Sequence, residues 1–104
     1  MNLNKACTEA VKIARARQLK ENTVQTLKHC AGEIVEATEA YMALQSVVWA
    51  ETSTQEMITR AGHDFAIELA DVIMCILSIC GAEYIDIERA LDECFQKNKA
   101  RVKK

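Results

Sequence analysis

The chain has 104 residues and a mass of 11.6 kDa; half of its residues are apolar, 27% are charged, and the formal net charge is −2. This balance predicts one folded domain over residues 1–104 and excludes a disordered polyelectrolyte. The sequence has no Pro and only three Gly. Because sheets with tight turns usually need more of both, the composition disfavours an all-β fold.

Charge is distributed unevenly along the chain. Residues 1–29 carry a net charge of +4 and residues 95–104 one of +5, whereas residues 30–94 hold thirteen acids and two bases. A nucleic-acid partner would need one continuous basic face, so none is expected. The sequence begins without an apolar signal core, and Glu68 and Asp71 interrupt its longest apolar tract, so we expect a cytoplasmic protein without a membrane segment.

Apolar residues at helical spacing predict a first helix over residues 4–19 and a second over residues 23–49, with Thr23 as the N-cap of the second. The main core face of the second helix is predicted to contain Val24, Leu27, Ala31, Ile34, Thr38 and Met42. Five cysteines without a CxxC pair indicate reduced, mostly buried thiols.

After a connector, the pattern predicts a short helix over residues 55–60, with Ser53 and Glu56 at the spacing of a capping box. Gly62 is expected to break it, and Asp64 to cap a third helix over residues 65–82. Asp86 is expected to cap a fourth helix that ends near residue 102. Short connections favour antiparallel neighbours, so the predicted fold is an all-α antiparallel four-helix bundle.

Four acids form two pairs with the same spacing. Glu33 and Glu36 lie three residues apart on the second predicted helix, and Glu68 and Asp71 lie three apart on the third. The members of each pair lie about 60° apart on one face, so two carboxylates can hold a common ion. Glu33 emerges from an apolar strip, and Glu68 and Asp71 emerge from a helix that is apolar all round and therefore predicted to be buried.

Buried carboxylates need protonation, pairing with Lys or Arg, or a metal ion. Only two bases occur in residues 30–94, and hard divalent cations are the simpler remedy; an all-carboxylate set favours Mg²⁺ or Mn²⁺ over zinc. A di-iron site would need Glu-x-x-His pairs, but neither His29 nor His63 follows a Glu by three. We expect both histidines to be surface or capping groups. A solvated acidic face remains the structural alternative.

The segments GEIVEATEAY (residues 32–41) and ELADVIMCIL (residues 68–77) together resemble the MazG-like all-α nucleoside triphosphate pyrophosphohydrolases. That family carries EExxE on one helix and ExxD on a later helix. Glu33 and Glu36 match the second and third acids of the first motif, and Glu68 and Asp71 match the second motif. Gly32 stands in place of the first acid. The segment KNKAR (residues 97–101) is similar to a phosphate-binding cluster on the family's last helix.

The resemblance implies hydrolysis between the α and β phosphates of a nucleoside triphosphate, which yields the monophosphate and pyrophosphate and clears unwanted nucleotides from the pool. It implies Mg²⁺, with Mn²⁺ as a substitute, on Glu33, Glu36, Glu68 and Asp71, which are also the catalytic residues. It implies phosphate contacts from Lys97, Asn98 and Arg101, and a homodimer or dimer of dimers. The alternative is a non-catalytic helical binding or assembly module that keeps the bundle without activity.

Overall fold

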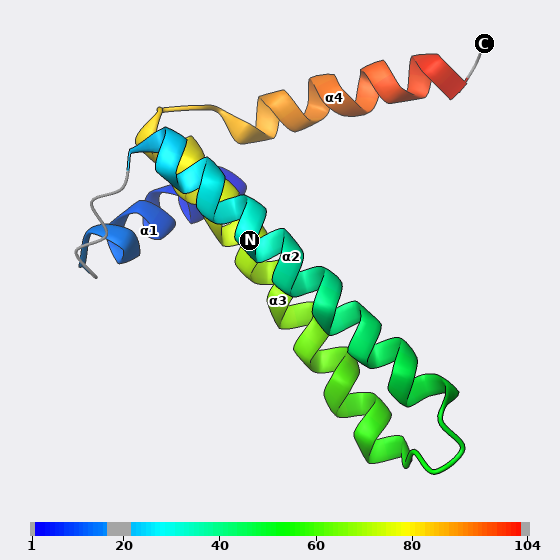
Figure 1. The fold of residues 1–104 in the computed structure, drawn as a ribbon. Helices are drawn as coiled ribbons and strands as arrows, with labels where there is room; N and C mark the ends of the chain where they lie inside the picture. Colours follow the sequence, from blue (N-terminus) through cyan, green and yellow to red (C-terminus); the bar gives the residue numbers. More distant parts are fainter. Residues whose placement is uncertain (1, 17–21, 103–104) are drawn as a thin grey trace. The chain divides into compact units, whose positions relative to one another are not determined.

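The computed structural model describes residues 2–16 and 22–102, and these contain four helices and no strand (Figure 1). The helices are α1 (Leu3–Ala16), α2 (Thr23–Trp49), α3 (Gln55–Ala82) and α4 (Ile87–Val102). The predicted all-α class is confirmed, as are the bounds of the second and fourth helices. The predicted end of the first helix falls outside the described residues.

The chain divides into two compact units, and α3 belongs to both. The first unit contains the described residues of 1–20 together with residues 77–102; the second contains α2, the connector and α3 as far as Ile76. All four acids of the predicted motifs lie in the second unit. Lys97, Asn98 and Arg101 lie in the first.

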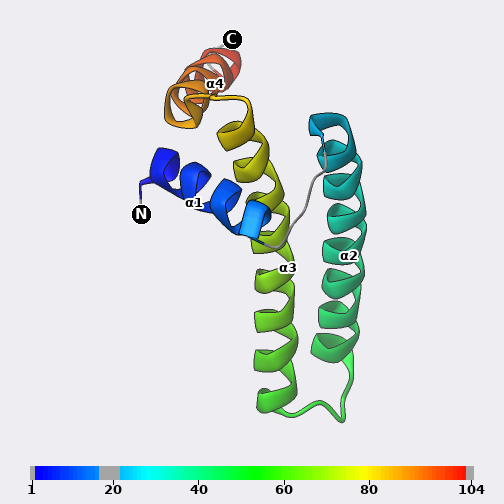
Figure 2. The same ribbon diagram turned by 90° about the vertical axis from the view of Figure 1, so that its left-hand side faces the viewer.

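In the second unit, α2 and α3 are antiparallel and lie side by side, joined by the connector 50–54 (Figures 1 and 2). The predicted cap of α2 is one residue off, because Asn22 and not Thr23 occupies the cap position. Its side-chain Oδ1 accepts from the backbone N–H of Gln25 at 2.9 Å, and the Gln25 side chain accepts from the Asn22 N–H at 3.0 Å. This reciprocal pair satisfies two donors that a helix start otherwise leaves free.

The predicted break at Gly62 is wrong: α3 runs without interruption from Gln55, so Asp64 lies inside the helix and caps nothing. One interior Gly costs about 1 kcal/mol relative to Ala. Breaking the helix would instead free several backbone donors and acceptors, which is more expensive. The predicted cap is also shifted, since Thr54 Oγ1 accepts from the Met57 N–H at 3.2 Å, in place of Ser53 and Glu56.

The prediction that the third helix is buried all round is wrong for the single chain. Only Leu77 and Cys80 of α3 are buried, whereas Ile67, Leu69 and Ile73 are 44–53% exposed. One neighbouring helix covers one stripe of its partner, so the remaining faces of a helix in a two-helix pair stay open. By length and composition alone, α3 is also apolar enough to cross a membrane.

In the first unit, α1 packs on the C-terminal end of α3 (Figure 2). Cys7 and Ala10 of α1 form a buried cluster with Leu77 and Cys80. Gly81 permits this contact: a Cβ at that position would lie 2.5 Å from the carbonyl oxygen of Cys7. The close approach, and not a helix stop, is therefore the role of this glycine.

The chain turns from α3 into α4 at Tyr84, whose φ of 56° lies in the left-handed region. The N–H of Ile85 donates to the Cys80 carbonyl at 2.9 Å, which closes the end of α3. Asp86 caps α4, as predicted, by accepting from the Arg89 N–H at 3.1 Å. Asn4 of α1 donates to both Asp86 and Glu88 at 3.0 Å and ties α1 to the start of α4.

Candidate metal centre

Three of the four predicted acids come together in the second unit. Glu33 and Glu36 of α2 and Glu68 of α3 each offer one carboxylate oxygen, and these oxygens lie within 4.8 Å of one another. The i, i+3 spacing puts the first two on one face of α2, and the antiparallel pairing brings the third opposite them. Asp71 is exposed and lies outside this set, although its charge acts on both Glu33 and Glu68.

Two of the carboxylate oxygens are fully buried and lack a partner. They are Oε2 of Glu33 and Oε2 of Glu68, which make no hydrogen bond. Leaving a charged acceptor buried and unpaired is costly, and native structures rarely tolerate it. Among the described residues, no Lys or Arg forms an ion pair with Glu33, Glu36 or Glu68. A cation bound by these oxygens would therefore remove the free-energy cost of burying them without a partner.

Burial and mutual repulsion both act against ionisation in this cluster. Loss of water around the Glu33 carboxyl raises its pKa above 4.5, and the negative charges of Glu36 and Asp71 raise it further. The pKa of Glu68 is raised in the same way, first by burial and then by the charges of Glu36, Asp71, Glu33 and Asp64. Without a cation, burial and repulsion thus shift the ionisation of Glu33 and Glu68 toward the protonated form.

The donor set fits a hard divalent cation. Carboxylate oxygens are the ligands that Mg²⁺ and Mn²⁺ prefer, and the set contains neither a thiol nor an imidazole nitrogen. The Cys75 thiol, on which the charges of Glu33 and Asp71 act, is no competitor: burial, and then contact with Cys30, raise the pKa of Cys75 to about 12, which keeps it protonated. Glu33, Glu36 and Glu68 would therefore hold the ion, with the charge of Asp71 beside them.

His29 is the residue at this site that the sequence interpretation missed. It is exposed, as expected, but its Nε2 lies 3.1 Å from Oε1 of Glu33, a contact that was not expected. The positive charge of this imidazole acts against the raised pKa of Glu33. Its position four residues before Glu33 was the available signal, since i and i+4 side chains meet on one helix face.

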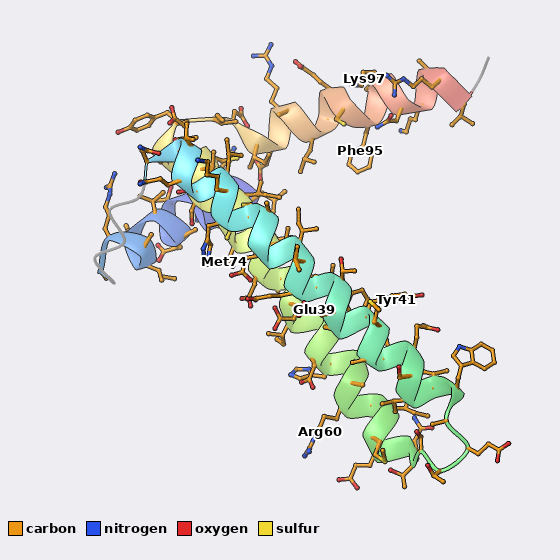
Figure 3. All side chains as sticks on the ribbon, viewed as in Figure 1. Glu39, Tyr41, Arg60, Met74, Phe95 and Lys97 are labelled. Atoms are coloured by element: carbon orange, nitrogen blue, oxygen red, sulfur yellow. The ribbon has the colours of Figure 1, made fainter. Side chains whose placement is uncertain are left out.

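The other residues of the predicted motifs are exposed. Gly32 is exposed, and nothing lies within 4 Å of the place where its Cβ would be, so the missing first acid leaves open space. Lys97, Asn98 and Arg101 are all exposed on α4 in the first unit, and Asn98 Nδ2 contacts the Cys94 thiol at 3.6 Å. Figure 3 shows Lys97 on α4.

The opposite edge of the α2–α3 pair is apolar. A shallow groove there is lined by Ile34, Ala37, Thr38, Tyr41, Phe65, Leu69 and Val72. The rings of Tyr41 and Phe65 pack at a centroid distance of 5.3 Å across the two helices. Figure 3 shows Tyr41 and Glu39 on opposite sides of α2, as their separation of about 160° around the helix requires.

The predicted core face of α2 continues this edge and is open in the single chain. Val24, Leu27, Ile34 and Met42 are each more than half exposed. Trp49 is 80% exposed, and its indole N–H donates to Gln45 at 3.1 Å. Within residues 2–16 and 22–102, this face therefore does not form the predicted buried core.

Comparison with family models, with curated proteins and with solved structures found no match for this chain.

Proposed function

We propose that this protein is a Mg²⁺-dependent nucleoside triphosphate pyrophosphohydrolase of the MazG-like type, which cleaves between the α and β phosphates and serves nucleotide-pool house-cleaning. The observation that carries the proposal is the carboxylate cluster, in which oxygens from two helices lie within 4.8 Å and two buried oxygens have no partner. The ordered motifs of the sequence supply the reaction class. Mn²⁺ is expected to substitute for Mg²⁺ because it accepts the same oxygen ligands.

In this proposal a bound divalent cation neutralises triphosphate charge and polarises the phosphorus under attack. Glu33, Glu36 and Glu68 hold it through oxygens that otherwise repel one another. Asp71 is exposed, as Glu36 is, and its negative charge acts on Glu33 and Glu68. One of these carboxylates accepts the proton of the attacking water as general base.

Contacts to the phosphates are assigned to Lys97, Asn98 and Arg101 by the resemblance. Their angular positions on α4 span about 100°, so one anion can meet all three side chains. Charge-assisted hydrogen bonds from Lys and Arg suit phosphate oxygens. Substitution of these residues tests whether they contact the phosphates.

The proposal includes a homodimer or a dimer of dimers. The apolar edge of α2 and α3 supports it, since a contiguous exposed apolar surface usually marks a protein interface. A second copy would cover Tyr41, Phe65 and Leu69 with the same residues of its own, as two-fold pairing requires. The proposal places the protein in the cytoplasm, with neither a membrane nor a nucleic acid as partner.

The test combines metal binding with product analysis. At a free Mg²⁺ or Mn²⁺ concentration ten times the Kd, the folded state gains about 1.4 kcal/mol, which corresponds to roughly 5–10 °C in Tm for a domain of this size. A panel of canonical and modified nucleoside triphosphates is then assayed, with pyrophosphate, orthophosphate and monophosphate measured separately. Pyrophosphate with monophosphate is the expected result, and orthophosphate alone would show that the wrong bond is cut.

The competing proposal is a non-catalytic helical binding or assembly module. Gly32 in place of the first family acid favours it, because the ligand set is smaller by one carboxylate. A Tm that does not change at millimolar metal, together with no turnover of any nucleotide, would support this alternative.

A further inference from the structure

The two oxygens of Glu33 have different surroundings. Oε1 lies 3.1 Å from Nε2 of His29, whereas Oε2 is buried and has no hydrogen-bond partner. The Glu33 side chain as a whole is 16% exposed and that of His29 is 55% exposed. One oxygen of the carboxylate therefore contacts a half-exposed imidazole, and the other oxygen is buried.

His29 does not itself belong to the set of prospective ligands. The atoms that lie within 4.8 Å of one another come from Glu33, Glu36 and Glu68 alone among the described residues. The imidazole reaches Oε1 because it lies four residues before Glu33 on α2, which places the two side chains one above the other. The imidazole of His29 thus contacts Oε1 of Glu33 and leaves Oε2 without a partner.

We infer that His29 is a positioning residue for the cation site: the contact of its Nε2 with Oε1 of Glu33, at 3.1 Å, holds that carboxylate so that its buried Oε2 is left for the cation. This inference rests on the proposed function, since it assumes that the cluster binds a divalent cation. In known metal sites, groups that hydrogen-bond to a ligand set its orientation, and removing them lowers metal affinity 10–100-fold.

Mn²⁺ alone serves as the probe, with affinity measured by electron paramagnetic resonance titration on the full chain. His29→Ala is expected to weaken Mn²⁺ binding by at least about tenfold. His29→Gln, which keeps an N–H donor on the same turn, is expected to stay within about threefold of wild type. His63→Ala is the matched control, because His63 is also exposed but lies on α3 outside the cluster, and it should bind as wild type does.

The Tm measured without metal separates an effect of the substitution on folding from an effect on metal binding. An i, i+4 pair on one helix contributes little to stability when one partner is open to solvent, as His29 is, so His29→Ala should leave the metal-free Tm nearly unchanged. Mn²⁺ affinity of His29→Ala within threefold of wild type, or a Gln variant as weak as the Ala variant, would overturn the inference while leaving the proposed function in place. Wild-type protein that binds no Mn²⁺ would overturn both.

Discussion

The two edges of the α2–α3 pair both carry groups that lack a partner, and these groups are charged on one edge and apolar on the other. On one edge, Glu33 and Glu68 bury carboxylate oxygens that have no partner. On the other, Tyr41, Phe65 and Leu69 line an apolar groove that none of the described residues covers. A small cation would satisfy the first edge and a large apolar surface the second, so the chemistry of each edge indicates the kind of partner that would fit it.

The largest effect is expected on the acidic edge. Glu68→Gln or Asp71→Asn should abolish pyrophosphate release, a loss of at least about 100-fold, because each removes a negative charge from a site whose catalysis depends on the bound cation. Helical circular dichroism should be retained. Glu39→Gln is the control, since Glu39 lies outside the cluster of carboxylates that the structure brings together. Normal turnover of both variants would show that these two acids are structural. It would contradict the assignment of catalysis to the acidic edge.

The apolar edge is tested by a charge placed in the groove. Leu69→Glu should raise the dimer Kd by about 100-fold or more, because a buried unpaired carboxylate at an interface costs several kcal/mol. Sedimentation velocity across a concentration series provides the measurement.

Ile67→Glu is the matched control for this change. Ile67 is as exposed as Leu69 and lies on the same helix, but about 160° away from it. If both variants remain dimers, or if the wild type is a monomer, the apolar edge is not the interface. Recovery of wild type only with detergent would instead favour a lipid environment for α3.

A smaller effect is expected from a residue on neither edge. Lys97→Ala should raise the KM for the nucleotide about tenfold, as expected for loss of one charge-assisted hydrogen bond, with the Mn²⁺ affinity unchanged. Steady-state kinetics and a metal titration separate the two quantities. A parallel loss of metal binding would contradict the assignment of Lys97 to the phosphates.

The smallest expected effect is a pH dependence confined to the acidic edge. Since the pKa values of Glu33 and Glu68 are raised in the folded state, that state binds more protons than the unfolded chain at pH values just above 4.5. The metal-free protein should therefore lose stability as the pH rises from 5 to 7, by a few degrees in Tm. Saturating Mg²⁺ or the Glu33→Gln change should flatten this slope; an unchanged slope would show that these carboxyls are not its source.

Sequence patterns predicted much of the local structure, and their errors have identifiable causes. The bounds of α2 and α4 and the Asp86 cap were predicted because periodicity and capping are local properties. The break at Gly62 was wrong because one weak helix former cannot outweigh the hydrogen bonds on either side of it. The caps of α2 and α3 each moved by one residue, to Asn22 and Thr54, since neighbouring polar residues compete for that role.

At the site, helix-face geometry predicted which acids share a side, but not how they would meet. Glu33 and Glu36 are brought together with Glu68, whereas Asp71 stays exposed at the margin. The contact of His29 with Glu33 was overlooked, although the i, i+4 spacing of the two residues places their side chains on one helix face. The expected burial of α3 was wrong because apolar composition shows what a helix needs to cover and leaves open whether its own chain supplies the cover.

By itself, the sequence determined the helices, their faces and the surplus of negative charge in the middle of the chain, because periodicity and charge are properties of short segments. Only the tertiary structure decided which oxygens became buried without a partner, which histidine reached Glu33, and which apolar face was left open. Those outcomes depend on how α2 and α3 pair, since the distance between side chains on two helices is set by packing and not by either helix alone.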